Sequence, residues 1–262
     1  MQIGNVELLG LAAAAFVVFS MAASAVYVFN DSLDIEEDRN HPLKKNRPLA
    51  AGTLNRRFAA VLIPLFALPS LAASWLLNPS LFGLVLLYMV MNAAYGWKLK
   101  HIPIVDITVI ASGFVIRVVV GAVVTGTAIY MWILIMTFLL ALFLALAKRR
   151  DDVILFVAAD RKSRKTIDGY NLAFIDSAMM IMAAVTIVAY ILYTVSPDVM
   201  MKFGTDKLYT TTLFVILGIL RYMQITLVEN RSGSPTEVLL RDGFLQLAIL
   251  GWLATFALLI YL

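Results

Sequence analysis

Residues 8–39 read LLGLAAAAFVVFSMAASAVYVF-NDSLDIEEDR, a 22-residue apolar run followed directly by a cluster of acids. Acidic side chains are costly in hydrocarbon, so acids gathered at the end of a membrane helix indicate a functional site. If the helix continues through the acids, Asn30, Asp34 and Asp38 fall on one face at intervals of four, and Asp31 lies beside them. Such carboxylates repel one another unless a cation lies among them, and their hard oxygens suit Mg²⁺ held together with substrate phosphates. The alternative is a solvated acidic helix end.

The chain as a whole is strongly apolar. Hydrophobic residues make up 61% of it, charged residues 15%, and its mean hydropathy is +0.88, whereas a soluble domain has about 25% charged residues. A membrane span needs about 20 apolar residues. We therefore predict an all-α protein, a polytopic transmembrane helical bundle with no separate soluble domain. Its eight predicted spans are 8–29, 57–77, 81–97, 103–124, 130–147, 172–195, 208–228 and 243–262.

The residue inventory excludes several kinds of site. The absence of cysteine excludes disulfides, thiolate catalysis and cysteine-bound metal. Both histidines, His41 and His101, lie in predicted loops, so we expect no histidine-based metal site. The sequence has no serine triad, zinc motif, Walker loop or dinucleotide fingerprint. We also expect neither a signal peptide nor a nucleic-acid partner.

Basic residues are distributed unevenly over the loops. The loops after the first, third, fifth and seventh spans, with their edges, hold 17 of the 21 Lys and Arg, whereas the opposite side has only Lys202 and Lys207. The positive-inside rule then places the acidic cluster and the basic loops in the cytoplasm and both termini outside. The remaining cations, Arg117 and Arg221, lie within spans.

Two of the cytoplasmic loops carry candidate ligands for phosphate. Prolines and a glycine within 42–52 argue against a regular helix there. Arg47 is the stronger candidate in that loop, because Lys44 and Lys45 could equally face anionic lipid headgroups. The loop after the fifth span begins with KRRDD at 148–152, where cations and carboxylates together suit a polyanion bridged by metal. Interfacial anchoring is the alternative.

Further candidates lie in and around the later spans. The apolar segment 153–159 could form a helix on the membrane interface, and the basic stretch 160–170 after it favours lipid-headgroup or phosphate binding. The segment 95–101, YGWKLKH, places aromatic rings beside lysines, which suits either a substrate or an interfacial belt. Arg117 is about 14 residues, roughly 20 Å, from the cytoplasmic end of its span. At that depth it needs an acid or a bound phosphate as partner.

Together these groups predict one basin at the cytoplasmic edge of the membrane. It has an acidic, metal-competent rim, two basic loops and an apolar interior. Such a basin suits a phosphorylated, water-soluble donor that meets a lipid substrate.

At the acidic cluster the chain resembles the UbiA superfamily of intramembrane prenyltransferases. Their first signature, N-D-x-x-D-x-x-x-D, is matched in full by Asn30, Asp31, Asp34 and Asp38. The resemblance implies helices around a central cavity open to the cytoplasm, with Mg²⁺ at its acidic mouth. It implies a single transmembrane domain over 1–262 in the plasma (inner) membrane, among membrane lipids, with the active site facing the cytoplasm. Homo-oligomer formation is left open.

A narrower similarity is to the decaprenyl-phosphate phosphoribosyltransferase branch. That branch transfers 5-phosphoribose from phosphoribosyl diphosphate to a polyprenyl phosphate, releases diphosphate and feeds arabinose donor synthesis for cell-envelope glycans. The similarity runs nearly the whole length of the chain. It includes 28–42, 47–52, Ala94-Tyr95, Leu99-Lys100-His101, Ile116-Arg117, Ala147-Lys148-Arg149, Arg164-Lys165 and Leu220-Arg221-Tyr222.

Two departures from the superfamily pattern stand out. The superfamily typically has nine spanning helices, so the eight found here suggest that the first one is missing before Met1. Prenyl-diphosphate users carry a second Asp-rich motif after the fifth span. This chain has Lys148-Arg149 at that point with Asp152 three residues after the Arg, as the phosphoribosyl branch does.

The resemblance also implies roles for single residues. Asp31, Asp34 and Asp38 are catalytic and, with Asn30, hold Mg²⁺. The implied substrate-binding set is Asn30, Arg47, Tyr95, Lys100, Arg117, Lys148, Arg149, Asp152 and Lys165. Two rivals remain: an aromatic prenyltransferase that uses a prenyl diphosphate to make a quinone or haem precursor, and a non-enzymatic binder or transporter of lipid phosphates.

Overall fold

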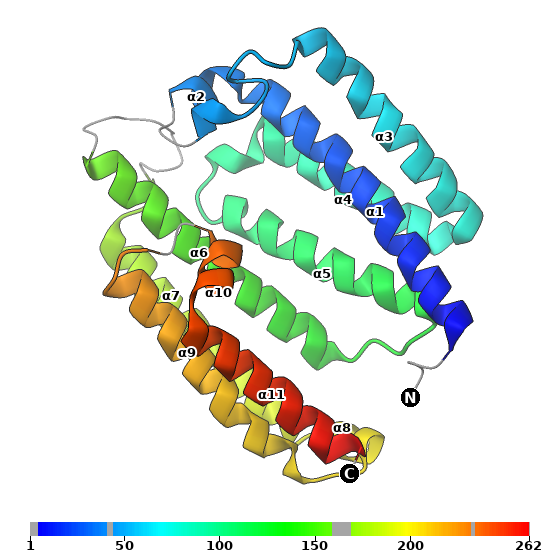
Figure 1. Ribbon diagram of the computed structural model, residues 1–262, viewed down its shortest axis with the longest axis vertical. Helices are drawn as coiled ribbons and strands as arrows, with labels where there is room; N and C mark the ends of the chain where they lie inside the picture. The colour runs from blue at the N-terminus through cyan, green and yellow to red at the C-terminus, as the bar shows by residue number, and fades with distance from the viewer. Residues whose placement is uncertain (1–4, 41–43, 159–168, 232–233, 262) are drawn as a thin grey trace. The chain divides into compact units, whose positions relative to one another are not determined.

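The computed structural model describes residues 5–40, 44–158, 169–231 and 234–261, and within these ranges the chain forms helices and turns without a β-strand (Figure 1). Eight of the helices are long and apolar enough to cross a membrane. They match the eight predicted spans one for one, which confirms the all-α transmembrane fold. The orientation in the membrane and the single domain remain predictions.

The described residues form two compact units, one up to Ile129 and one from Tyr130 onward. In the first unit α1 packs against α3, α4 and α5, as Figure 1 shows. The elements of this unit are α1 (Val6–Leu33), α2 (Ile35–Arg39), η1 (Lys44–Asn46), α3 (Arg56–Leu77), α4 (Pro79–Trp97), η2 (Leu99–His101) and α5 (Val105–Thr125).

The core of the first unit combines small residues on α1 with larger ones on its neighbours. Ala22 of α1 is fully buried in a cluster with Leu81 and Val85 of α4. Small side chains let membrane helices approach closely. At one such approach the Ser70 hydroxyl of α3 donates to the Val18 carbonyl of α1 at 2.8 Å. The close packing of these helices holds α1, whose C-terminal end carries the acidic cluster, in place.

In the second unit α6 packs against α7, and α9 packs against both α7 and α11. Trp252 Nε1 donates to the Tyr190 hydroxyl at 2.6 Å, and this hydroxyl lies 2.7 Å from that of Thr211. Such a chain satisfies polar groups that would otherwise be costly in an apolar interior. The elements are α6 (Met131–Ala158), α7 (Leu172–Thr194), α8 (Pro197–Phe203), η4 (Lys207–Thr211), α9 (Thr212–Leu227), α10 (Pro235–Arg241) and α11 (Gly243–Tyr261).

Two helices run farther than their apolar sequence alone predicts. α1 continues through Asn30 and Asp31 and breaks only at Asp34, which separates it from α2. α6 continues to Ala158, so the described part of 153–159 extends a spanning helix instead of forming a separate helix on the interface. No glycine or proline occurs within α6, so nothing in the sequence ends the helix where its apolar residues end.

Candidate functional site

The acidic motif lies at the end of α1 and in α2. The Asp34 N–H donates to the Asn30 carbonyl at 3.0 Å, and the Asp38 N–H donates to the Asp34 carbonyl at 2.8 Å. These bonds carry the helical spacing across the break, so the three residues remain one turn apart, as the sequence predicted. Asp34 and Asp38 are buried. Buried carboxylates need partners, and the structure supplies cations from two other segments.

Asn30 lies where α1 contacts Gly96 of α4. A Cβ added at Gly96 would overlap the Asn30 side-chain oxygen and come within 3.1 Å of Asn30 Cγ. Glycine is therefore the residue that leaves room for the amide. Asn30 Oδ1 is buried and accepts no hydrogen bond from any described residue. A buried acceptor that has no donor among the described residues is suited to contact a bound ligand.

Arg47 joins the two outer acids of the motif. Its Nη1 donates to Asp31 Oδ1 at 2.8 Å and to Asp38 Oδ2 at 2.9 Å. The Asp38 side chain is 2% exposed, whereas those of Arg47 and Asp31 are 39% and 32% exposed. One partly exposed positive charge thus holds two carboxylates together.

The loop that carries Arg47 folds back against α2. Its described part, 44–55, contains a single 3₁₀ turn and a left-handed Gly52 with φ of 78°, so the prediction that it forms no regular helix is confirmed for these residues. Arg39 Nε donates to the Ala50 carbonyl at 3.2 Å, and the Ala51 N–H donates to the Arg47 carbonyl at 2.8 Å. These bonds fix the backbone at Arg47 relative to the acids.

The third acid takes its cation from a different loop. Lys100, in η2, forms a salt bridge with Asp34 Oδ1, and the side chains of both residues are at most 10% exposed. Since η2 directly follows α4, the helix that contains Gly96 also directs Lys100 toward the motif. The structure therefore brings six predicted residues together: Asn30, Asp31, Asp34, Asp38, Arg47 and Lys100.

The oxygen ligands of this motif fit Mg²⁺, the ion that the resemblance implies. Within the described ranges no three acids or histidines lie close enough together to form a ready metal cage, because each acid of the motif faces a cation. Two carboxylates nevertheless converge on one positive charge at Arg47, and the buried Asn30 oxygen has no donor. Mg²⁺ prefers such oxygens and completes its shell with water and phosphate.

Two further candidates of the first unit differ in position. Tyr95 is half-buried and directly precedes Gly96. Arg117 lies among aromatic rings: its guanidinium carbon is 5.4 Å from the ring centre of Phe19 and 5.3 Å from that of Tyr88. Phe19 precedes Asp31 by 12 residues on the same helix, a rise of about 18 Å. The structure therefore does not bring Arg117 to the acidic motif.

In the second unit the predicted cations begin a charged turn of α6. Arg149 is 6% exposed and donates through Nη1 to Asp152 Oδ2 at 2.7 Å. Lys148, one residue earlier, is exposed. Lys165, the remaining predicted ligand, lies in 159–168, outside the described residues. Of the two predicted cations in this turn, Lys148 is exposed and Arg149 is buried and paired with an acid.

Sequence reasoning missed the role of Arg150. It is 6% exposed and donates to Asp176 Oδ1 of α7 at 2.8 Å, to the Thr226 carbonyl of α9 at 2.8 Å and to Asn230 Oδ1 at 2.7 Å. These contacts make it a clamp between helices. A charge within the run Lys148–Asp152 gives no sign of which helix it will meet, so the sequence held no signal for this role.

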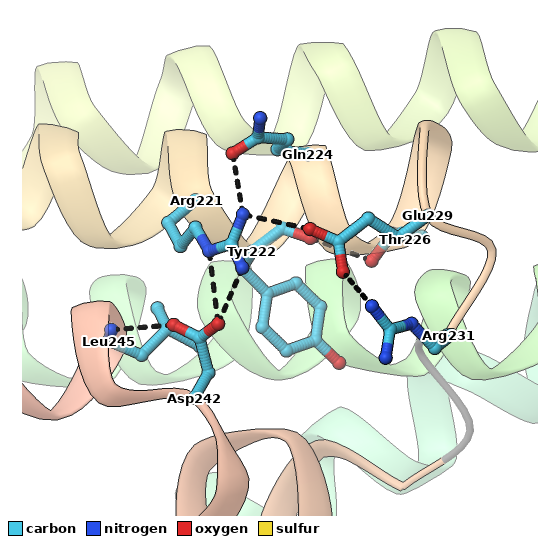
Figure 2. Close-up of polar contacts among 8 residues, drawn as sticks. All are labelled: Arg221, Tyr222, Gln224, Thr226, Glu229, Arg231, Asp242 and Leu245. Carbon is cyan, nitrogen blue, oxygen red and sulfur yellow. Dashed lines mark hydrogen bonds and ion pairs between the residues drawn. The ribbon is translucent and has the colours of Figure 1, made fainter.

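A second clamp holds α11, as Figure 2 shows. Arg221 of α9 donates to Asp242 Oδ2 through Nη2 at 2.6 Å and to Glu229 Oε1 through Nη1 at 2.9 Å. The Asp242 carboxylate also accepts from the Leu245 N–H at 2.8 Å and so caps α11. The hydrogen bond from Arg221 holds the pKa of Asp242 below its usual value of 3.8.

Tyr222 stands beside this clamp with a different environment. Its hydroxyl is buried and has no hydrogen-bond partner among the described residues, and its ring lies 5.5 Å from that of Phe143 on α6. In Figure 2 no dashed contact reaches this hydroxyl, whereas the neighbouring Arg221 has several. The clamp accordingly involves Arg221 and leaves Tyr222 outside it.

The chain is similar to proteins of a known family. A family model described as the UbiA prenyltransferase family matches residues 2–250. The decaprenyl-phosphate phosphoribosyltransferase of Mycobacterium tuberculosis is 33% identical over 95% of this chain and 82% of its own length. That of Corynebacterium glutamicum is 31% identical over 95% of this chain and 76% of its own.

A solved structure shows the same fold at lower identity. A UbiA homolog from Archaeoglobus fulgidus bound to GPP and Mg²⁺ superposes with a TM-score of 0.70 at 19% identity, covering 96% of this chain and 88% of that one. The match covers most of both chains, so the two proteins share a fold.

Proposed function

Because this chain belongs to the UbiA prenyltransferase family and is therefore a membrane transferase, we propose that it transfers 5-phosphoribose from phosphoribosyl diphosphate to a polyprenyl phosphate. Diphosphate is the second product. The phosphoribosyltransferases of Mycobacterium tuberculosis and Corynebacterium glutamicum each match it over 95% of its length. Decaprenyl phosphate or a similar lipid is the acceptor that their names suggest.

One contact carries the choice of donor. Arg149 is buried, and its guanidinium is paired with Asp152 at 2.7 Å. In a prenyl-diphosphate site of the kind that the resemblance implies, this position would supply a second set of metal-binding carboxylates. Here the acid neutralises an arginine instead. A turn that keeps a cation at this point favours direct binding of phosphate groups.

The motif acids take the metal-binding role in this proposal. Asn30, Asp31, Asp34 and Asp38 would hold Mg²⁺, which supplies neutralising charge for the departing diphosphate when it is bound. Arg47 and Lys100, which contact the acids in the first unit, are assigned to the donor's phosphates. Fixed positive charge aimed at a leaving group lowers the barrier to its departure.

The reaction needs few other groups. The bond between ribose C1 and the diphosphate oxygen breaks, and its electron pair leaves with diphosphate. An oxygen of the acceptor phosphate forms the new bond to C1. Because that phosphate is already an anion, no general base is required, and none is assigned.

The remaining residues receive roles by their chemistry. Lys148 and Arg149 are assigned to phosphate in the second unit, with Asp152 as the positioning residue for Arg149. Tyr95 and Lys165 keep the substrate-binding role that the resemblance implies. Arg117, which lies against Phe19 about 18 Å along α1 from Asp31, is assigned to the lipid acceptor rather than to the donor. We place the active site at the cytoplasmic face of the plasma membrane. The phosphoribosylated lipid would serve there as a precursor for cell-envelope arabinan.

The test is a donor competition in membranes that contain the protein. Membranes are incubated with labelled phosphoribosyl diphosphate, polyprenyl phosphate and Mg²⁺. We expect a labelled lipid and one equivalent of diphosphate, with both lost on chelation of the metal. A labelled lipid formed instead from a prenyl diphosphate and an aromatic acid would overturn the choice of substrates.

A further inference from the structure

The contact between Arg47 and the acidic motif has a consequence for metal binding. A single nitrogen of Arg47 lies 2.8 Å from Asp31 Oδ1 and 2.9 Å from Asp38 Oδ2. These are two of the carboxylates that would hold Mg²⁺ under the proposed function. A guanidinium and a divalent cation repel each other, and each requires the same oxygens. Arg47 and the metal therefore compete for the acids.

We propose that Arg47 exchanges partners during binding: it holds Asp31 and Asp38 together before the metal arrives, and the metal releases it to bind the donor's diphosphate. This inference rests on the proposed function, because it uses the metal and diphosphate assigned there. It gives the two ligands a reason to bind cooperatively. The metal takes the carboxylates and diphosphate takes the guanidinium. Whichever ligand binds first therefore breaks the salt bridge that would oppose binding of the second.

The surroundings of Arg47 permit the exchange. Its side chain is 39% exposed, so a released guanidinium meets solvent or phosphate and is not stranded in an apolar interior. Its backbone is held by hydrogen bonds on both sides, from the Arg47 N–H to the Lys44 carbonyl at 2.9 Å and from the Ala51 N–H to the Arg47 carbonyl at 2.8 Å. The side chain can therefore move while the loop stays folded.

Lys100 shows why the exchange belongs to Arg47. Lys100 and Asp34 have side chains that are 5% and 10% exposed. Separating such a pair leaves an ammonium group buried without compensation, which is far more costly than releasing an arginine whose own side chain is 39% exposed. A guanidinium also matches phosphate with two parallel hydrogen bonds, which an ammonium group does not.

The experiment measures metal binding without any substrate. Purified full-length protein in detergent is titrated with Mn²⁺, as a probe for Mg²⁺, and bound metal is followed by electron paramagnetic resonance. We expect Arg47→Gln to bind Mn²⁺ about fivefold more tightly than wild type, the size of effect that releasing a partly exposed salt bridge gives. Arg56→Gln is the matched control: it removes an exposed cation whose partner at 3.8 Å is Glu36, which is not one of the proposed metal-binding residues.

The direction in which the affinity for Mn²⁺ changes distinguishes the exchange from a purely structural role of Arg47. Unchanged affinity in Arg47→Gln overturns the exchange, and so does weaker affinity, which would mean that Arg47 only holds the acids in place. Equal tightening in Arg56→Gln also overturns it, because a general charge effect would then suffice. If Arg47→Gln does not elute as a folded protein, Arg47→Lys decides: the exchange predicts tighter Mn²⁺ binding than wild type, because a lysine does not reproduce the contacts of the guanidinium with both carboxylates, and unchanged or weaker binding overturns it.

A second titration adds inorganic diphosphate. We expect Mn²⁺ to raise the affinity of the wild-type protein for diphosphate at least fivefold more than it does in Arg47→Gln, because only wild type gains a released guanidinium. Equal coupling in both proteins overturns the proposal. No sugar donor or lipid acceptor is present, so failure here leaves the transfer reaction to its own assay.

Discussion

The side-chain amide of Asn30 lies against Gly96, so closely that a single added methyl group would overlap its oxygen. Asn30 begins the acidic motif on α1, and Gly96 is the second-last residue of α4. The glycine is required here for space and not for its backbone conformation, since it is absent from the positive-φ residues. Contact between these two helices thus sets the position of the first residue of the acidic motif.

Gly96→Ala is expected to reduce transfer activity by about 10- to 100-fold, because a displacement of about 1 Å at a reacting site has effects of this size. The protein itself should melt within a few degrees of wild type, since the group that must move is the end of a side chain. Activity in membranes and thermal unfolding in detergent measure the two effects. Gly83→Ala, on the same helix with nothing within 4 Å of the added carbon, is the control and should change neither.

The buried pair of Asp34 and Lys100 allows its structural and chemical roles to be separated. Asp34→Asn leaves the Lys100 ammonium buried without its charged partner, which should cost about 3 kcal/mol of stability and abolish transfer. The double variant Asp34→Asn/Lys100→Met removes both charges, so it should recover most of the stability and none of the activity. Full transfer by Asp34→Asn in the presence of Mg²⁺ would contradict the metal-binding role.

The sequence predicted the parts of this protein that depend on local pattern. Eight apolar runs yielded eight spans because the thickness of a bilayer fixes the length of a helix that crosses it. The one-turn spacing of Asn30, Asp34 and Asp38 followed from helical periodicity, although the break at Asp34 did not. Apolar length also failed to mark the end of α6, because charged residues continue a helix when no glycine or proline stops them.

Contacts between segments that are distant in the sequence could not be predicted from it. Nothing in the run Lys148–Asp152 distinguishes Arg149, which pairs within its own helix, from Arg150, which reaches two other helices. The need for glycine at position 96 depends on the approach of α1, 66 residues earlier at Asn30. Such pairings are decided by the packing of helices, which no single stretch of residues encodes.

Arg150 should be a determinant of stability and not of chemistry. Arg150→Gln removes donors to Asp176, the Thr226 carbonyl and Asn230. The Asp176 side chain left behind is 33% exposed, so water partly replaces the arginine, and the loss should cost about 1–3 kcal/mol. Unfolding in detergent should therefore begin at clearly lower temperature or denaturant concentration. Arg241→Gln is the control, because that arginine is 80% exposed in its pair with Glu237 and should contribute little. Equal stability of the two variants would contradict the clamp.

The contact between Arg221 and Asp242 should make stability depend on acidity in a defined direction. The hydrogen bond from Arg221 holds the pKa of Asp242 below 3.8 in the folded protein, so near that pH the unfolded chain binds more protons than the folded one. The stabilisation is therefore fully present above about pH 4 and is lost as the pH falls through the lowered pKa.

Asp242→Asn removes the charge and keeps a side chain able to cap α11. We expect it to melt roughly 2–4 °C below wild type at pH 7, with a difference that shrinks below pH 4. Glu237→Gln, at an exposed pair, should show no such trend. In an Arg221→Gln background, Asp242→Asn should lose most of its effect at every pH. A difference that instead grows toward low pH would mean that the salt bridge does not stabilise the folded state.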